Sequence, residues 1–193
     1  MRVILTRHGE TEQNKAGICQ GQSIPGKLSE DGIAQAKQLA LRLKDEKFDV
    51  IYSSDLARAA DTAKEIAKFH SDTKIHLIKE LRERDHGSSS GKHHSEIDYR
   101  SLPDDAESDE QLSKRAKKLI DEIYEKHKED TVLLLGHGGI NAAIISAVTG
   151  KPLLEVFGMA KWKNTNVNIF EIDEDKNHKI HCLNCTKHLE QQN

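Results

Sequence analysis

Short runs of β-branched and aliphatic residues alternate along this chain with longer stretches in which apolar residues recur every three or four positions. A short apolar run bounded by polar residues predicts a β-strand, and an apolar repeat near 3.6 residues predicts an amphipathic helix. Strands that alternate with helices indicate an α/β fold with a mostly parallel sheet. The four strands predicted in this way cover residues 3–5, 49–52, 75–78 and 131–135.

Amphipathic segments occupy most of the sequence between these strands. Ser29 suits the N-cap of the first helix, because its hydroxyl can accept a hydrogen bond from a free amide of the first turn. Arg58 falls in the first turn of the second helix, near the end of the second strand. Helices on both faces of the sheet would produce a three-layer α/β/α sandwich. They are predicted over residues 30–43, 56–67, 107–128 and 139–148.

Other parts of the chain depart from this alternation. Residues 167–172 alternate between apolar and polar, which predicts a strand at the sheet edge, and residues 179–183 could pair with it as an antiparallel hairpin. Residues 85–106 show little apolar periodicity and are expected to form a loop or lid. Residues 1–193 are expected to form a single domain that ends in a flexible tail at 189–193.

Charge and cysteine content exclude several classes of protein. The 29 lysine and arginine residues nearly balance the 32 aspartate and glutamate residues, so the net charge of -3 gives no electrostatic case for a nucleic-acid or membrane partner. The N-terminus holds no apolar stretch long enough for a signal sequence or a membrane span, and a cytoplasmic location is expected. Three cysteines, an odd number, argue against a disulfide framework, and reduced thiols are expected.

Reactive side chains follow the predicted strands at the points where those strands end. Arg7 and His8 come after the first strand, Arg58 shortly after the second, and His137 after the fourth. Since ligands of open α/β sheets collect beyond the carboxyl ends of the strands, these four side chains are predicted to converge on one site. The helix that begins after Gly138 would also direct free amides toward an anion there.

Such a set suits the transfer of a phosphoryl group, which requires a nucleophile, neutralisation of three equatorial oxygens and a proton for the leaving group. His8 can act as the nucleophile, because a neutral imidazole is competent near physiological pH, and Gly9 would let a substrate approach the backbone. Arg7 and Arg58 can grip phosphate oxygens in bidentate fashion. His137, if protonated, would add a further donor.

The sequence Leu-Thr-Arg-His-Gly-Glu-Thr at residues 5–11 resembles the signature of the histidine phosphatase, or phosphoglycerate mutase-like, superfamily. The resemblance implies an enzyme that forms a phosphohistidine on His8 and requires neither a metal nor an organic cofactor. Further agreement extends over nearly the whole chain, at Asn14 and at residues 20–22, 28–32, 53–58, 81–84 and 136–139.

The same resemblance assigns the remaining roles. Glu83, which follows a Leu-Arg pair, is the acid that protonates the leaving alcohol and then activates water. Asn14, Gln20 and Gly21 match positions that line the phosphate pocket in the family. The expected partner of the protein is therefore a small-molecule phosphate monoester.

Hydrolysis is the favoured reaction, with a cofactor-dependent phosphoglycerate mutase and a catalytically idle phosphate- or protein-binding relative as alternatives. A mutase must hold a second anionic group, yet the basic residues between positions 91 and 109 are few, namely Lys92 and Arg100. An idle relative is expected to lack the nucleophile, an arginine or the acid, and all of these are present. The alcohol of the substrate is left open, although residues 85–106 and 161–164 are expected to shape its side of the site.

Two C-terminal features admit other interpretations. A zinc site formed by the histidines and cysteines between residues 178 and 188 is disfavoured, because one pair of cysteines is weak evidence and a strand would point His181 and Cys182 to opposite faces. An edge strand at residues 167–172 would offer a contact for a homodimer, and the oligomeric state is left open.

Overall fold

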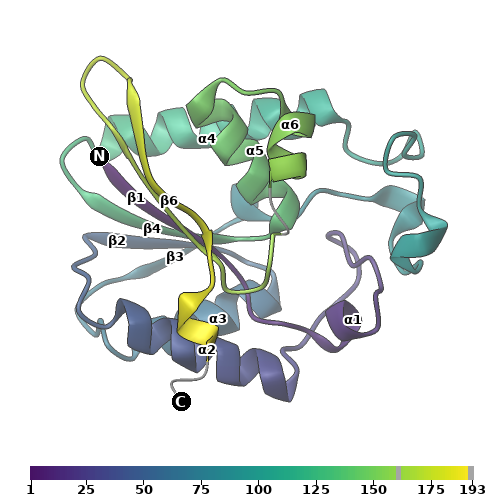
Figure 1. The fold of residues 1–193 in the computed structure, drawn as a ribbon, viewed down its shortest axis with the longest axis horizontal. Coiled ribbons are helices and arrows are strands. Elements are labelled where there is room, and N and C mark those ends of the chain that lie inside the picture. Colours follow the sequence, from purple (N-terminus) through teal and green to yellow (C-terminus); the bar gives the residue numbers. More distant parts are fainter. Residues whose placement is uncertain (160–161, 191–193) are drawn as a thin grey trace.

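The computed structural model describes residues 1–159 and 162–190, which include a six-stranded sheet with the order β3-β2-β4-β1-β5-β6 (Figure 1). β1 to β4 run parallel to one another, whereas β5 is antiparallel to both of its neighbours. The strands are β1 (Arg2–Arg7), β2 (Val50–Ser54), β3 (Ile75–Ile78), β4 (Thr131–Gly136), β5 (Val167–Ile172) and β6 (His178–Cys185).

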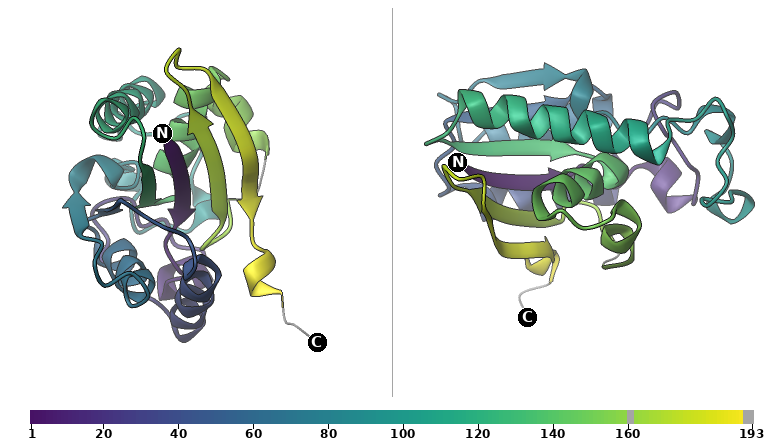
Figure 2. Two further views of the ribbon diagram at one scale, coloured as in Figure 1. Left: turned by 90° about the vertical axis from the view of Figure 1, so that its left-hand side faces the viewer. Right: turned by 90° about the horizontal axis from the view of Figure 1, so that it is seen from above.

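Helices cover both faces of the sheet and produce three layers (Figure 2). The predicted α/β/α architecture with a mostly parallel sheet is therefore confirmed. On one face lie α2 (Glu30–Leu43) and α3 (Ala57–Ala67), and on the other lie α4 (Asp109–Lys126) and α5 (Gly138–Thr149), with α6 (Leu153–Met159) packed against α5. The remaining elements are α1 (Glu12–Lys15) and the short 3₁₀ helices η1 (Lys79–Leu81), η2 (Gly87–Ser89), η3 (His94–Glu96) and η4 (Lys187–Leu189).

Side chains of the central strands alternate between two halves of the core. Val3 and Leu5 are fully buried among residues of α4 and α5, whereas Ile4 between them is buried against α2 and α3. Leu133 and Leu134 of β4 divide between the two faces in the same way. Because successive side chains point to opposite faces, a strand covered on both sides is apolar at consecutive positions. This explains the unbroken apolar runs in the sequence.

The C-terminal strands form the antiparallel hairpin that the sequence predicts at the edge of the sheet. Residues 167–172 form β5, the inner strand of that hairpin, which is paired with β1 as well as with β6, and its Phe170 is fully buried in the core. The outer strand is β6, so any pairing between copies of the chain along this edge would use β6. Of the residues predicted to form a flexible tail, Leu189 lies in η4, and residues 191–193 lie outside the described part of the chain.

Local capping chemistry accounts for where the long helices begin. Ser29 accepts a hydrogen bond of 3.0 Å from the amide of Gly32, as its predicted N-cap position requires. Ser108 and Gln111 exchange hydrogen bonds in a capping box that starts α4. The sequence does not predict α6, because its seven residues are too few to show a helical repeat.

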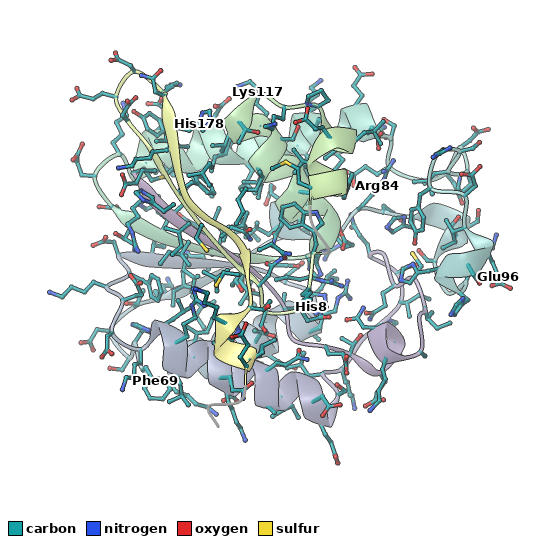
Figure 3. The ribbon with its side chains drawn as sticks, viewed as in Figure 1. His8, Phe69, Arg84, Glu96, Lys117 and His178 are labelled. Carbon is teal, nitrogen blue, oxygen red and sulfur yellow. The ribbon has the colours of Figure 1, made fainter. Side chains whose placement is uncertain are left out.

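Residues 85–106 contain only two 3₁₀ turns, η2 and η3. The amide of Cys19 donates to the carbonyl of Lys92 at 2.9 Å, and the amide of Gly91 donates to the carbonyl of Cys19 at 2.8 Å. Glu96 marks the outer end of this segment in Figure 3. The loop is therefore attached by its backbone to the segment that follows α1.

Among the described residues, no single helix has the length and apolar composition needed to cross a membrane. α5 and α6 meet that test only when they are taken together, and the two are bent by 115° relative to each other. Six residues of α5, from Ile140 to Ile145, are buried inside the protein.

The segment after β1 packs closely against the start of α2 through two glycines. A Cβ atom on Gly9 would lie 2.5 Å from the carbonyl oxygen of Gly32, and one on Gly32 would lie 1.9 Å from the carbonyl oxygen of Glu10. The space beside Gly9, which the sequence assigns to an approaching substrate, is therefore filled by α2. The amide of Gly9 also donates to the hydroxyl of Thr62 at 3.0 Å. Both contacts fix the backbone that follows His8.

Replacement of Gly32 by alanine should lower the free energy of unfolding by about 1–3 kcal/mol, because the new methyl group would overlap a backbone oxygen. Gly158→Ala is the matched control, since a Cβ there meets nothing within 4 Å and alanine is favoured over glycine in a helix by up to about 1 kcal/mol. Urea unfolding of the parent and both variants measures the difference. Equal stability of the two variants would contradict this account of the packing.

Candidate active site

All four parallel strands end at one edge of the sheet, and each of them leads into one group of side chains. Arg7 ends β1 and His8 follows it, Arg58 stands in the first turn of α3 after β2, His137 is the N-cap of α5 after β4, and Glu83 follows β3 and η1. In Figure 3, His8 lies near the middle of the molecule where β1 ends. The fold thus brings together the five side chains that the sequence singles out.

The orientation of the His8 ring leaves one nitrogen free to react. Nδ1 lies 2.6 Å from the carbonyl oxygen of Gly9, and because a carbonyl oxygen only accepts, Nδ1 carries the proton of the neutral ring. The lone pair of that ring is then on Nε2. Burial lowers the pKa of His8 well below 6.5, and the positive charges of Arg58 and Arg7 lower it further. His8 is therefore neutral near physiological pH, with its lone pair on Nε2.

His137 lies beside His8, with the two ring centroids 4.9 Å apart. Arg58 Nε donates to Nδ1 of His137 at 3.2 Å, so Nε2 carries the proton and donates to the hydroxyl of Ser54 at 2.9 Å. Burial and then the charge of Arg58 hold the pKa of His137 well below 6.5. The neutral ring thus orients Arg58, and it does not offer the additional donor that a protonated ring would supply.

The two arginines are held by backbone carbonyl groups. Arg58 is 2% exposed and donates from Nη2 to the carbonyl of Gly21 at 2.9 Å, and Arg7 donates from Nη1 to the carbonyl of Trp162. Burial lowers the pKa of Arg58 to about 10, with Glu83 acting in the opposite direction, and burial also lowers the pKa of Arg7. Within the described chain, Nε of Arg7 is buried without a hydrogen-bond partner. A guanidinium with unused donors can bind an anion.

Glu83 accepts two backbone hydrogen bonds on the same oxygen. Oε1 accepts from the amide of Gly139 at 2.9 Å and from the amide of Arg84 at 2.8 Å. A Cβ on Gly139 would lie 2.5 Å from Oε1, so this glycine lets the carboxylate approach α5. A Cβ on Gly138 would lie 3.8 Å from Oε2 and 3.9 Å from Cζ of Arg7. The carboxylate therefore stands at the positive end of α5, with Oε2 on the side of Arg7.

Ion pairs on both sides of Glu83 fix its backbone. Arg82 forms a bidentate pair with Asp55, with both N···O distances at 2.6 Å, which ties this segment to the end of β2. Arg115 of α4 donates to the carbonyl oxygens of Arg82 and Glu83 at 2.9 and 3.4 Å, and Glu107 pairs with its guanidinium. These contacts hold the carboxylate in place relative to the ends of the parallel strands.

The other predicted pocket residues differ in how they are connected to this group. Asn14 accepts a hydrogen bond of 3.2 Å from Asn164. Gln20 is buried, and its Nε2 has no hydrogen-bond partner among the described residues. Gly21 has a φ of 53°, which favours glycine, and supplies the carbonyl that holds Arg58. Gly21 and Gly138 thus lie beside the two arginines, and Asn14 is linked through Asn164 to the carbonyl of His8, whereas the side-chain oxygen of Gln20 accepts from the hydroxyl of Thr11 at 2.8 Å.

Three further contributions were not recognised in the sequence. Ser54 accepts from His137, and its only signal is its place at the end of β2 within a motif shared with the family. Asn164, which the sequence places on the leaving-group side, instead donates to the carbonyl of His8 at 3.0 Å. Trp162 binds Arg7 through its carbonyl, a group that every residue has, so no sequence signal exists. Lys161, expected in the same region, lies outside the described residues.

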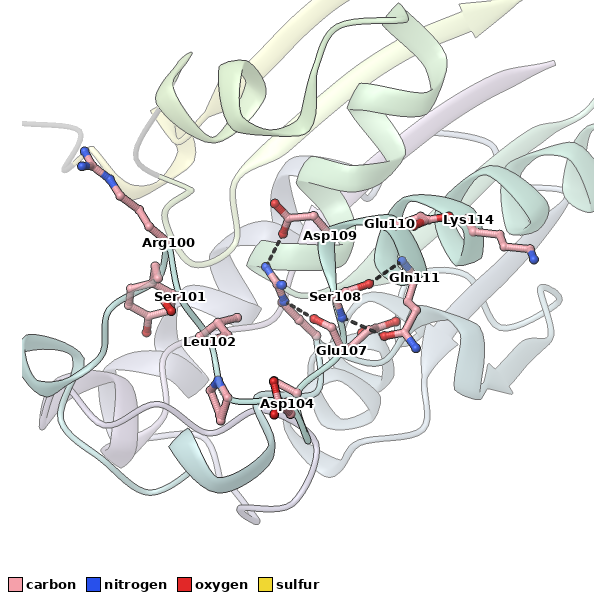
Figure 4. A pocket seen from close by; sticks show the side chains of 14 residues that line it. Arg100, Ser101, Leu102, Asp104, Glu107, Ser108, Asp109, Glu110, Gln111 and Lys114 are labelled. Atoms are coloured by element: carbon pink, nitrogen blue, oxygen red, sulfur yellow. Dashed lines mark hydrogen bonds and ion pairs between the residues drawn. The ribbon is translucent and has the colours of Figure 1, made fainter.

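A cavity of about 510 Å³ opens beyond Arg7 and the start of α5. Figure 4 shows a neighbouring cavity of about 710 Å³, between residues 99–106 and the start of α4. Arg84 and Asp109, which form an ion pair of 2.6 Å, line both cavities. The cavity next to Arg7 has polar groups from Arg84, His86, His94 and Arg100 and apolar groups from Leu154, Phe157 and Trp162.

In the part of the chain that the structure describes, no group of three or more histidine, cysteine, aspartate or glutamate side chains is arranged to hold a metal ion. The C-terminal candidates for zinc ligands have separate partners. His181 lies 3.2 Å from Glu171, and Cys185 accepts from Arg42 at 3.2 Å. Around His8 the cationic groups are arginines, which favour an anion.

Relatives of known function agree with this geometry. Residues 3–186 match the model of the histidine phosphatase superfamily (branch 1). The chain is 34% identical over 190 residues to a metal-independent phosphoserine phosphatase of Arabidopsis thaliana, a match that covers 90% of this chain and 77% of that protein. It is also 34% identical over 205 residues to phosphoserine phosphatase 1 of Hydrogenobacter thermophilus, with 98% of this chain and 94% of that protein covered.

Solved structures lead to the same family. A mutant phosphoserine phosphatase of Entamoeba histolytica, in complex with phosphoserine, matches this fold with a TM-score of 0.86 and 28% identity, over 98% of this chain and 99% of that one. The family model, the two curated relatives and this structure all extend over most of the chain. The chain therefore belongs to the histidine phosphatase superfamily and is a phosphatase of that type.

Proposed function

We propose that this phosphatase hydrolyses small-molecule phosphate monoesters without a metal ion, through a phosphohistidine formed on His8. The observation that carries the proposal is the state of His8: a neutral ring with its proton held on Nδ1 by the carbonyl of Gly9, and with Arg58 and Arg7 nearby. A neutral imidazole can donate its electron pair to phosphorus, and the two cations attract the phosphate that carries it.

In the first step, Nε2 of His8 attacks phosphorus while the bond from phosphorus to the ester oxygen breaks. Arg7 and Arg58 neutralise the equatorial oxygens of the transferring group. The negative charge of the bound phosphate favours the protonated form of His137, which then becomes a further donor. Glu83, which takes up a proton as the phosphate anion binds beside it, gives that proton to the departing oxygen, so the alcohol leaves neutral and Glu83 becomes a carboxylate again.

In the second step, the Glu83 carboxylate takes a proton from water as the water oxygen attacks phosphorus. The phosphorus–nitrogen bond breaks, inorganic phosphate forms and His8 returns to its neutral state. Oε1 of Glu83 is occupied by the amides of Gly139 and Arg84, which leaves Oε2 for both proton transfers. Asn14, Gln20, Gly21 and Gly138 complete the phosphate pocket in this proposal, with the unpartnered Nε2 of Gln20 as a donor.

Phosphoserine is the first substrate that we propose to test. Two curated relatives are named as phosphoserine phosphatases, and the similar structure contains phosphoserine. The cavity next to Arg7 combines guanidinium and imidazole groups with apolar side chains, which suits a small alcohol that carries its own polar groups. A phosphoglycerate mutase and a non-catalytic phosphate-binding protein are the competing proposals. We further propose that the phosphatase is located in the cytoplasm.

The test is phosphate release from a panel of phosphoserine, 3-phosphoglycerate, sugar phosphates and an aryl phosphate. His8→Ala should lower kcat by at least about 10³-fold, because the nucleophile is lost. His178→Ala is the matched control, since that exposed imidazole lies on β6, away from the site (Figure 3). Excess chelator should change nothing.

Each alternative to this function has its own outcome in that experiment. Phosphate release that survives in His8→Ala would exclude the nucleophile, and release that requires an added divalent ion would exclude the metal-free mechanism. Isomerisation of 3-phosphoglycerate without release would identify a mutase. Binding of phosphate without turnover of any ester would support the non-catalytic alternative.

Glu83→Gln should slow alkyl esters such as phosphoserine by about 10²–10⁴-fold and aryl esters much less, because a good leaving group departs without a proton. Glu80→Gln is the matched control, because Glu80 is an exposed carboxylate of η1 close by in the sequence. Rates for the two ester classes with each variant measure the effect. An equal loss for both classes would point to another acid.

The unfolding free energy should fall as pH drops below 6.5. His8 and His137 have folded-state pKa values well below 6.5, so they stay neutral in the native state while the unfolded chain takes up protons. Each of these two histidines lowers the free energy of unfolding by about 2 kcal/mol at pH 5 if its ring remains neutral in the folded protein at that pH. His188, with a pKa of about 4, acts in the same direction.

Urea unfolding at pH 7 and pH 5 measures this loss of stability. His8→Gln should remove its share of the pH dependence, whereas His178→Gln, which replaces an exposed histidine, should leave it unchanged. If both variants kept the full dependence of the parent, the neutral state assigned to His8 would be wrong.

A further inference from the structure

Cys182 and Cys185 lie on β6, where the strand pairing is irregular. Cys182 stands opposite Ile169 and Cys185 opposite Val167, so three steps along β6 match two steps along β5. This extra residue is a β-bulge, and Asn184 within it has a φ of 49°. Residues three apart on a regular strand point to opposite faces, but the bulge turns both cysteine side chains to the same face.

The spacing across the bulge is near the limit for a disulfide. Two steps along a strand cover about 6.6–6.8 Å, at the upper end of the Cα separations, about 4.4–6.8 Å, that a disulfide can bridge. Because the Cβ atoms of a disulfide lie only about 3.5–4.5 Å apart, closing the bond requires the two residues to move toward each other. The two thiols already lie within hydrogen-bonding reach of each other. Both are free and partly exposed, so a small oxidant can reach them.

One of the two thiols is activated. Arg42 of α2 donates from Nη1 to Sγ of Cys185 at 3.2 Å. Burial alone would raise the pKa of Cys185, but the amide of Lys187 and the charge of Arg42 hold it below its ordinary value. Burial and the neighbouring Cys185 raise the pKa of Cys182. Cys185 is thus the stronger thiolate former, and Cys182 is placed to react with its oxidised form.

We propose that Cys182 and Cys185 form a reversible disulfide when the protein meets a hydroperoxide. The Cys185 thiolate attacks the peroxide as the O–O bond breaks, takes one oxygen to become a sulfenic acid and releases the other oxygen as hydroxide from hydrogen peroxide or as alkoxide from an organic hydroperoxide. The thiol of Cys182 then attacks that sulfur, the S–S bond forms, and the sulfenic oxygen leaves as water with the thiol proton. Two thiols are oxidised and one peroxide is reduced.

Hydrogen bonds connect this bulge to the backbone of the nucleophile. The amide of Asn184 donates to Asn168 at 2.7 Å, and Asn168 donates to the carbonyl of Leu5 at 3.1 Å. In the adjoining segment, the amide of Thr165 donates to the carbonyls of Arg7 and His8 at 3.1 and 3.2 Å.

His188 lies in η4, shortly after Cys185, and its Nε2 is 3.2 Å from the hydroxyl of Thr165. Closing the disulfide would pull Cys185 from Arg42 and shift these contacts at the end of β1. Because positioning of a reacting group within 1 Å matters for rate, oxidation should lower kcat by about tenfold; this consequence rests on the proposed function of His8.

Mass spectrometry of the full-length protein tests disulfide formation directly. Trypsin releases both cysteines in the peptide 180–187 and Cys19 in the peptide 16–27. After treatment with hydrogen peroxide at pH 7, peptide 180–187 should lose two hydrogens and regain them with dithiothreitol, while peptide 16–27 keeps its thiol. Over-oxidation of either cysteine without the loss of two hydrogens, or no reaction, would overturn the proposal.

Variants separate the two steps. Cys182→Ser should accumulate a sulfenic acid on Cys185 that dimedone traps, whereas Cys185→Ser should give neither product. Arg42→Gln should slow disulfide formation by about threefold to tenfold, because it removes the charge beside the thiolate. Lys37→Gln, which removes a charge from an exposed position of the same helix, is the control. Equal rates for Arg42→Gln and Lys37→Gln would contradict the activation of Cys185.

The activity arm uses an aryl phosphate before oxidation, after oxidation and after reduction. A reversible loss of turnover in the parent, with no loss in either Cys182→Ser or Cys185→Ser, would support the coupling between the disulfide and the active site. Unchanged turnover of the fully oxidised protein would exclude this coupling. An inactive reduced protein would instead count against the proposed function, while the peptide masses would still report on the disulfide.

Discussion

The parallel register between β1 and β4 is the constraint on which the rest of the site depends. It places Arg7 opposite Gly136, and the amide of His8 donates to the carbonyl of Gly136 at 3.1 Å, so His8 and His137 leave the sheet side by side. A shift of one residue in this register would turn every side chain of β1 to the other face and separate the two rings. The register is held by apolar side chains buried on both faces of both strands.

The site is electrostatically demanding, because two guanidinium groups and two imidazoles are gathered in a largely buried place. Burial of charge without compensation is costly. The fold limits that cost by keeping both histidines neutral and by hydrogen-bonding the guanidinium groups to the carbonyls of Gly21 and Trp162. A single carboxylate, Glu83, offsets the two cations only in part, so the site attracts an anion.

The segments that surround this centre are less regular than the sheet. Side chains from residues 85–106 and from α6 line the cavity beyond Arg7, and the ion pair between Arg84 and Asp109 lines both this cavity and a second one. Such loops can change the choice of alcohol without changing the chemistry at the strand ends. The arrangement fits a superfamily whose members are named for different phosphate esters.

The sequence alone was sufficient for the α/β alternation, the N-cap at Ser29 and the convergence of side chains at the strand ends, because apolar periodicity and short motifs are local properties. Only the tertiary structure decided that β5 lies between β1 and β6, that the space beside Gly9 belongs to α2, and that His137 is held neutral by burial and by Arg58. Strand order, close backbone contacts and hydrogen-bond partners depend on which distant segments meet. These long-range contacts follow from packing over the whole chain, so no short stretch of sequence predicts them.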